Sequence, residues 1–175
     1  MAKPTEGAAR GVAAGVRAKP GKYLTFEVGQ EVYGLEILKV QEIIGIMRVT
    51  RVPGTPAFIR GVINLRGKVI PLVDLRSKFG LPAKEDTERT CIIVVQVRRE
   101  SQVLTMGIIV DEVKEVSVIG AAQLEPIPEF GGTIDTGFLL GVGKTGTRFV
   151  MLLDVDDVLL GSELASVAQA QAQGE

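Results

Sequence analysis

Two features of this sequence have residue types and a spacing that could bind a ligand or take part in catalysis. The first is a segment that resembles a phosphate-binding loop. Residues 141–145 read Gly-Val-Gly-Lys-Thr. The Walker pattern needs a glycine where Phe138 stands, and a helix should follow so that its amide groups face the phosphate. Gly146 and a strand-like run from Arg148 follow instead. The segment therefore predicts a hairpin turn.

The second feature is a pair of carboxylate clusters. Grouped carboxylates can transfer protons or bind a divalent cation. Their neighbours alternate with apolar residues, which is typical of strand ends whose acidic side chains face solvent. No nucleophile or base accompanies them, so we expect no catalytic residue and no metal site. The clusters are Asp111, Glu112 and Glu115, and Asp154, Asp156 and Asp157.

The missing residue types exclude more chemistry. The chain has no histidine and a single cysteine, Cys91. This excludes Ser-His-Asp and Cys-His catalysis, histidine metal sites and an internal disulfide. Cys91 precedes the apolar residues 92–95, so we expect it to be a buried strand residue of a protein from a reducing compartment. No cofactor is expected.

The overall composition indicates which kind of fold would position any such site. The 175 residues are 46% apolar and 23% charged with a net charge of −1, as in a globular protein of one domain, or two small ones, that does not bind nucleic acid non-specifically. Val and Ile together number 37 against 16 Leu, which favours strands. Residues 1–20 form a basic tail that we expect to be disordered. Neither a signal peptide nor an apolar run of membrane-spanning length is visible, so no membrane insertion and a cytoplasmic location are expected.

The ordered part, residues 21–160, reads as short strands separated by turns. Gly29-Gln30 predicts one tight turn, and residues 66–68 predict a hairpin tip. One helical turn is expected at 77–80 and a short C-terminal helix at 156–170, with a frayed end across 161–175. The expected strands cover residues 23–28, 31–35, 61–65, 69–73, 91–97, 103–110, 113–119, 138–142 and 148–155.

An internal repeat divides this part into two similar halves, about 22–80 and 90–156. A shift of 73 residues places Gly34 on Gly107 and Glu42 on Glu115, and a shift of 80 places Asp74 on Asp154. A unit of about 60 residues has a marginal core alone, so we expect the copies to pack closely or share strands. Closed barrels would remove exposed sheet edges. The other matches are Val40 with Val113, Pro53 with Pro126, Phe58 with Phe138, Gly61 with Gly141, Val62 with Val142 and Leu72 with Leu152.

Two residues are suited to binding a protein. Arg66 stands at the predicted hairpin tip, where a rigid arginine can pair with a partner carboxylate, although it can equally be a solvated side chain. Phe130 ends a Pro-restrained loop, where an aromatic side chain either anchors an interface or packs against its own barrel. From the residues alone, binding is favoured over catalysis.

Four long strings resemble the CheW-type chemotaxis coupling proteins. They are YGLEILKVQEI at 33–43, TPAFIRGVINLRG at 55–67, VIPLVDLRSKF at 69–79 and PIPEF at 126–130. The resemblance implies an all-β fold of two interlocked five-stranded SH3-like β-barrels. It implies a non-enzymatic adaptor that joins the cytoplasmic tips of methyl-accepting chemoreceptors to the regulatory domain of a CheA-type histidine kinase in signalling arrays.

The same resemblance implies two binding surfaces. The positions that match the receptor-binding groove are Val40, Glu42, Gly61 and Arg66, and those that match a kinase-binding loop are Glu125, Glu129 and Phe130. Some alternatives stay open at this stage. They are a coupling protein of a non-flagellar chemosensory pathway (surface motility, development or gene regulation), an enzyme that uses the carboxylate clusters, and a nucleic-acid adaptor, which the net charge opposes. CheV-type proteins and the kinase itself share the fold but carry further domains, for which this chain has no room.

Overall fold

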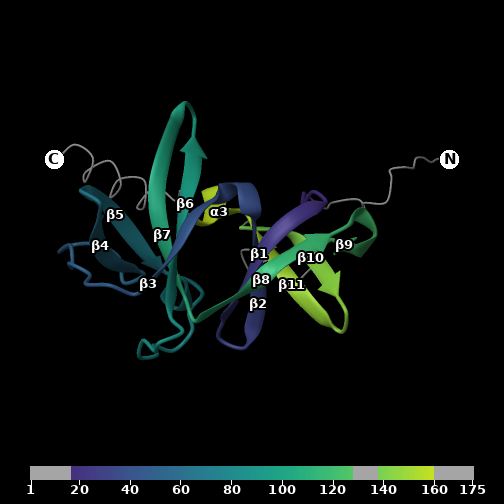
Figure 1. Ribbon diagram of the computed structural model, residues 1–175, viewed down its shortest axis with the longest axis horizontal. Helices are drawn as coiled ribbons and strands as arrows, with labels where there is room; N and C mark the ends of the chain where they lie inside the picture. Colours follow the sequence, from purple (N-terminus) through teal and green to yellow (C-terminus); the bar gives the residue numbers. More distant parts are fainter. Residues whose placement is uncertain (1–16, 128–137, 160–175) are drawn as a thin grey trace.

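The computed structural model describes residues 17–127 and 138–159, which form strands joined by short loops and a few single-turn helices (Figure 1). The strands expected from the sequence are confirmed, with shifted ends. The elements are β1 (Gly21–Val28), β2 (Glu31–Glu36), η1 (Ile37–Lys39), β3 (Val40–Gly45), β4 (Ile59–Leu65), β5 (Lys68–Asp74), α2 (Leu75–Lys78), β6 (Cys91–Arg99), β7 (Gln102–Val110), β8 (Glu112–Ile119), η2 (Ala121–Gln123), β9 (Leu124–Glu125), β10 (Leu139–Thr145), β11 (Arg148–Leu153) and α3 (Val155–Leu159).

Two sheets are built from these strands, and the expected pair of interlocked SH3-like barrels is confirmed. The five-stranded barrel has the strand order β3-β6-β7-β5-β4. The six-stranded barrel has the order β8-β1-β2-β11-β10-β9, in which the two-residue β9 is the strand beyond the expected five. Neither barrel is made from one half of the chain, because β1 and β2 pair with β8 and β11, and β6 and β7 pair with β3 and β5.

A glycine stands at the one parallel strand pairing of each barrel. Gly34 of β2 lies opposite Leu152 of β11, and Gly107 of β7 lies opposite Leu72 of β5. These are the same two repeat positions with the halves exchanged. A Cβ atom on Gly107 would lie 2.6 Å from a methyl of Leu72, and one on Gly34 would lie 3.0 Å from a methyl of Leu152. The repeated glycine thus leaves room for the repeated leucine.

Three apolar clusters form the core. One fills each barrel, and the largest lies between the barrels and takes side chains from both sheets. Strand β6 shows why the run 92–95 is apolar throughout, since Ile92 and Val94 face their own barrel whereas Ile93 and Val95 face the shared cluster. Strands buried on both faces lose the alternation of polar and apolar residues.

A row of stacked aromatic rings crosses the shared cluster. Phe26 stacks on Tyr33, Tyr33 on Phe79 and Phe79 on Phe138, with centroid separations of 6.1, 5.1 and 5.4 Å. Burial raises the pKa of the Tyr33 hydroxyl, and it also raises the pKa of Tyr23. The row joins β1 and β2 to residues that follow α2 and precede β10, so it ties the two barrels together.

Some expectations from the sequence need correction or fall outside the described residues. Helix α2 starts at Leu75, before the expected 77, because the Asp74 side chain accepts a hydrogen bond from the Arg76 amide and caps it. Cys91 is partly exposed, not buried, because it begins β6 opposite Gly45, which has no side chain to cover it. Only residues 17–20 of the expected tail and 155–159 of the C-terminal helical region are described.

Candidate functional site

The β4–β5 hairpin presents Arg66 as the sequence predicts. Leu65 pairs with Lys68, so Arg66 and Gly67 alone form the loop, both with positive φ (54° and 85°). This is the geometry of a two-residue type I′ turn, whose twist matches that of the flanking strands. The Asn64 side-chain oxygen accepts a hydrogen bond from the Gly67 amide at 2.8 Å and fixes the turn.

Arg66 and Glu42 form an ion pair between the hairpin tip and β3. Their side chains are 66% and 26% exposed, so the pair lies at the surface and a partner can reach the guanidinium. Val40 begins the same strand and packs in part against the shared cluster. Three of the four residues proposed for the receptor surface therefore lie on β3 or meet it.

Gly61, the fourth residue, has a structural reason to be glycine. Its φ is +147°, and a Cβ atom there would lie 2.2 Å from the carbonyl oxygen of Thr50. Thr50 and Val62 exchange two backbone hydrogen bonds of 2.9 and 2.8 Å, which hold the loop between β3 and β4 against β4. The close approach of that backbone leaves no space for a side chain. Gly61 thus shapes the surface around β3 and is itself buried.

The second predicted surface is described in part. Glu125 in β9 pairs with Lys144 of β10 at 3.2 Å, and Glu129 and Phe130 lie outside the described residues. Beside Glu125 is a largely apolar cavity of about 540 Å³. Phe149, 58% exposed, is part of its lining, which also includes Ile127, Val142 and Met151.

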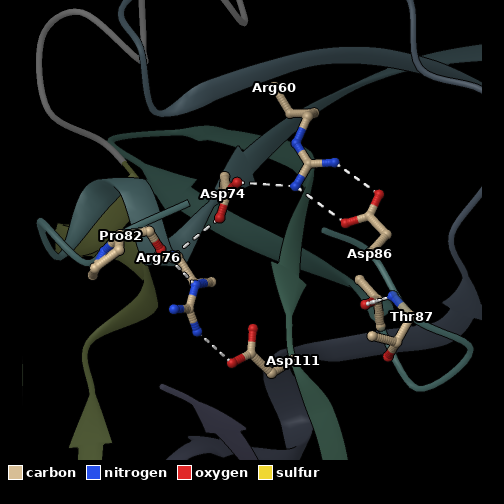
Figure 2. Close-up of polar contacts among 8 residues, drawn as sticks. Arg60, Asp74, Arg76, Pro82, Asp86, Thr87 and Asp111 are labelled. Atoms are coloured by element: carbon tan, nitrogen blue, oxygen red, sulfur yellow. Dashed lines mark hydrogen bonds and ion pairs between the residues drawn. The ribbon is translucent and has the colours of Figure 1, made fainter. Parts of the chain in front are cut away.

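A polar network that was not predicted from the sequence lies where the two barrels meet (Figure 2). Arg60 donates to Asp74 at 2.9 Å and to Asp86 at 3.0 Å, and Arg76 donates to Asp111 at 2.7 Å. Burial lowers the pKa of the Arg60 guanidinium, but its hydrogen bonds to Asp86 and Asp74 outweigh burial and leave that pKa raised. The repeat match between Asp74 and Asp154 was the one signal in the sequence.

Four of the six clustered carboxylates form ion pairs within the fold, and the phosphate-loop-like segment is part of a strand. Asp111 is a half-buried partner of Arg76, so the expectation that it faces solvent is wrong. Residues 141–145 belong to β10 and lead into a hairpin, as expected. Among residues 17–127 and 138–159, no cluster of three or more side chains could hold a metal ion. None of the helices in these residues has the length and hydropathy to span a membrane.

Comparison with known proteins identifies the family. The family model described as "CheW-like domain" matches residues 22–163, most of the chain. The chain belongs to the CheW-like family. The chemotaxis protein CheW of Klebsiella aerogenes is 42% identical over 146 residues, which are 83% of this chain and 86% of that protein. CheW of Bacillus subtilis is 34% identical over 152 residues, 86% of this chain and 94% of that protein.

A solved CheW structure has the same fold. The scaffolding protein TtCheW from Thermoanaerobacter tengcongensis superposes with a TM-score of 0.72 at 36% sequence identity, covering 82% of this chain and 95% of that one. The CheW-like match includes Val40, Glu42, Gly61, Arg66 and Glu125 and extends through 128–137. The matched region therefore spans all seven residues predicted for the two surfaces.

Proposed function

We propose that this chain is a non-enzymatic coupling protein that joins methyl-accepting chemoreceptor tips to a CheA-type histidine kinase in chemotaxis arrays at the cytoplasmic face of the membrane. The observation that carries this proposal is the CheW-like match over residues 22–163. The relatives reported above are chemotaxis proteins, which favours chemotaxis over a pathway of surface motility or gene regulation.

The receptor surface of this proposal comprises Val40, Glu42, Gly61 and Arg66. The Arg66–Glu42 ion pair supports it, because residues 24 apart in the sequence meet at an exposed position. The guanidinium retains donors that can bind a carboxylate of the receptor in two-point fashion. Gly61 contributes by holding the loop before β4 in place, and Val40 contributes an apolar edge.

The kinase surface of this proposal comprises Glu125, Glu129 and Phe130. The apolar cavity beside Glu125 supports it, since aromatic and apolar residues framed by a charged pair are typical of interface centres. Each interface of such an adaptor is expected to be of modest area, with strength gained from many copies in one array.

Calorimetric titration tests the two surfaces separately. We expect saturable binding of the regulatory domain of the cognate kinase, which Phe130→Ala weakens and Arg66→Ala leaves unchanged. We expect the reverse for a soluble receptor-tip fragment. The matched controls are Val118→Ala, at an exposed apolar residue of β8, and Arg148→Ala, at an exposed arginine next to the tip of the β10–β11 hairpin. Folded protein that binds neither fragment would refute the coupling function.

A further inference from the structure

The described chain passes from one barrel to the other at only two places. Residues 36–40, through η1, carry it from β2 of the six-stranded barrel to β3 of the five-stranded barrel. Asp111 alone separates β7 of the five-stranded barrel from β8 of the six-stranded one. Strands β3 to β7 all stay in one sheet, so these two crossings are the covalent links about which the barrels can turn.

Each crossing carries one charged side chain that is paired with a helix. Asp111 pairs with Arg76 of α2 at 2.7 Å, with side chains 15% and 17% exposed. Lys39 pairs with Asp156 of α3 at 3.0 Å, with side chains 29% and 33% exposed. Both pairs are better shielded from water than a surface ion pair, and screening by salt is accordingly weaker.

The two pairs occupy similar places in the two halves and have opposite polarity, although the shift of 73 residues places Lys39 on Glu112, one residue after Asp111. Arg76 and Asp156 are related by the same shift of 80 residues that relates Asp74 to Asp154. Lys39 and Asp111 both stand at the end of a crossing. The helix supplies the cation at one crossing and the anion at the other. The two halves therefore have in common an ion pair between a crossing and a helix, but not the residue types that form it.

Further hydrogen bonds make each pair a link between both barrels. The Asp111 carboxylate also accepts from the Gly29 amide at 2.9 Å, in the β1–β2 turn of the six-stranded barrel. The Asp156 carboxylate also accepts from the Arg98 amide at 3.0 Å, in β6 of the five-stranded barrel. Figure 2 shows the Arg76–Asp111 pair close to the Arg60 network.

The cluster between the barrels is apolar, and apolar contacts have no preferred direction. Packed elements can slide over such a contact in small shear motions. An ion pair with fixed hydrogen-bond partners sets one position. We propose that Lys39–Asp156 and Arg76–Asp111 act as two latches that fix the relative orientation of the barrels, and that opening the Lys39 latch uncouples β3 from the barrel that bears Glu125.

The location of Lys39 connects the latches to the proposed receptor surface. Lys39 directly precedes Val40, the first residue of the strand that carries Glu42. A partner that pulls on β3 therefore acts next to the latch. A bound partner can shift the barrels only if it binds the latched and the open states differently. This part of the inference rests on the proposed function, whereas the latches themselves are a property of the chain alone.

A distance measurement on the isolated protein tests the latches. Nitroxide labels at Lys68→Cys and Thr147→Cys, exposed positions on different barrels, are placed in a Cys91→Ser background. Pulsed dipolar spectroscopy then gives the distribution of distances between the barrels. We expect Lys39→Met to broaden this distribution or shift its mean.

Asp156→Asn provides a second variant, because the amide oxygen can still accept from the Arg98 amide while the charge is lost. Lys114→Met is the matched control, since Lys114 pairs with Glu27 at 3.1 Å at similar exposure within the six-stranded barrel. Both variants open the Lys39–Asp156 latch, so an unchanged distribution in both would overturn its proposed role in fixing the barrels, as would an equal change in the control. Because no receptor or kinase is present, this result is independent of whether the coupling function is correct.

The functional part has its own readout. In reconstituted arrays, we expect Lys39→Met to bind the receptor fragment as the parent does and to lose receptor control of kinase activity. Retained control together with a broadened distance distribution would limit the latches to a structural role and overturn their part in coupling.

Discussion

Replacing Gly61 by alanine should destabilise the protein through the backbone of a neighbouring loop. A Cβ atom at this position would lie 2.2 Å from the Thr50 carbonyl oxygen, 2.8 Å from its carbonyl carbon and 2.8 Å from a methyl of Val49. Two of these three atoms are backbone, so a side-chain rotation cannot relieve the overlap. Either the loop between β3 and β4 moves away, or the five-stranded barrel distorts.

The loss in free energy of unfolding can be estimated from the contacts that the new side chain would break. If the loop moves, both hydrogen bonds between Thr50 and Val62 are lost, at about 1 kcal/mol each. Alanine at a φ of +147° adds about 1 kcal/mol of backbone strain. The total is about 3 kcal/mol, which for a chain of this size lowers Tm by about 6–12 °C.

Calorimetry and urea unfolding measure this change. Gly45→Ala is the matched control, because Gly45 lies in β3 of the same sheet and has nothing within 4 Å of the position of a Cβ atom. We expect that control to be neutral or slightly stabilising, since alanine restricts the unfolded chain. A Tm of Gly61→Ala equal to that of the parent would refute the reasoning, as would an equal loss in Gly45→Ala. Receptor binding should also weaken in Gly61→Ala, because the loop between β3 and β4 moves, although Gly61 itself makes no direct contact with the receptor.

Three other predictions concern charged and titratable groups. Arg76→Met leaves a half-buried carboxylate without its cation and should cost about 2–3 kcal/mol in urea unfolding. Arg89→Met is the control, because Arg89 is 70% exposed and lies 3.7 Å from its partner, and it should change stability by less than about 0.5 kcal/mol. Equal effects of the two changes would contradict the argument from burial. Arg66→Ala should shift Tm by no more than about 4 °C, because a pair so exposed contributes at most about 1 kcal/mol; a larger loss in calorimetry would show that Arg66 contributes to folding stability. The pKa values of Tyr23 and Tyr33 are raised in the folded state, so stability is complete below their unfolded value of 10.0 and falls as pH rises toward the folded values. Tyrosinate absorbance should therefore titrate above 10.0 in the native protein and at the ordinary value in denaturant, and coincident titrations would remove burial as the cause.

Local features of the fold were predictable because their causes are local. The turn at Arg66 and Gly67 was predictable from a glycine between two alternating strands, because Gly67 adopts positive φ at no steric cost; the positive φ of Arg66 is uncommon for a residue with a side chain. The hairpin after residues 141–145 follows from the strand that replaces the helix of a phosphate loop. The apolar run 92–95 indicates a strand, and only the structure shows that its two faces serve different cores.

Long-range pairings were beyond the sequence alone. The parallel register of Gly34 with Leu152 joins residues far apart, and nothing near either residue specifies it. The role of Asp111 was missed for the same reason, since its partner Arg76 lies 35 residues earlier and an acidic residue at a strand end ordinarily faces water. Arg66 was a candidate from its place at the hairpin tip, whereas Val40, Glu42 and Gly61 came from the resemblance. The structure supplies the ion pair that joins Arg66 to Glu42.

The arrangement of strands also sets an order of events during synthesis. Strands β3 to β7 are consecutive, so the sheet of the five-stranded barrel is complete in sequence once residue 110 has emerged from the ribosome. The hairpin of β1 and β2 leaves first, yet its partners β8 and β11 end at residues 119 and 153. Its apolar strands must therefore wait for almost the whole chain, and exposed strand edges are where nascent proteins aggregate. A chain truncated between residues 119 and 153 would retain the complete five-stranded sheet, but its β1–β2 hairpin would lack the partner β11. The segment that is synthesised first is therefore the last to complete its strand pairing.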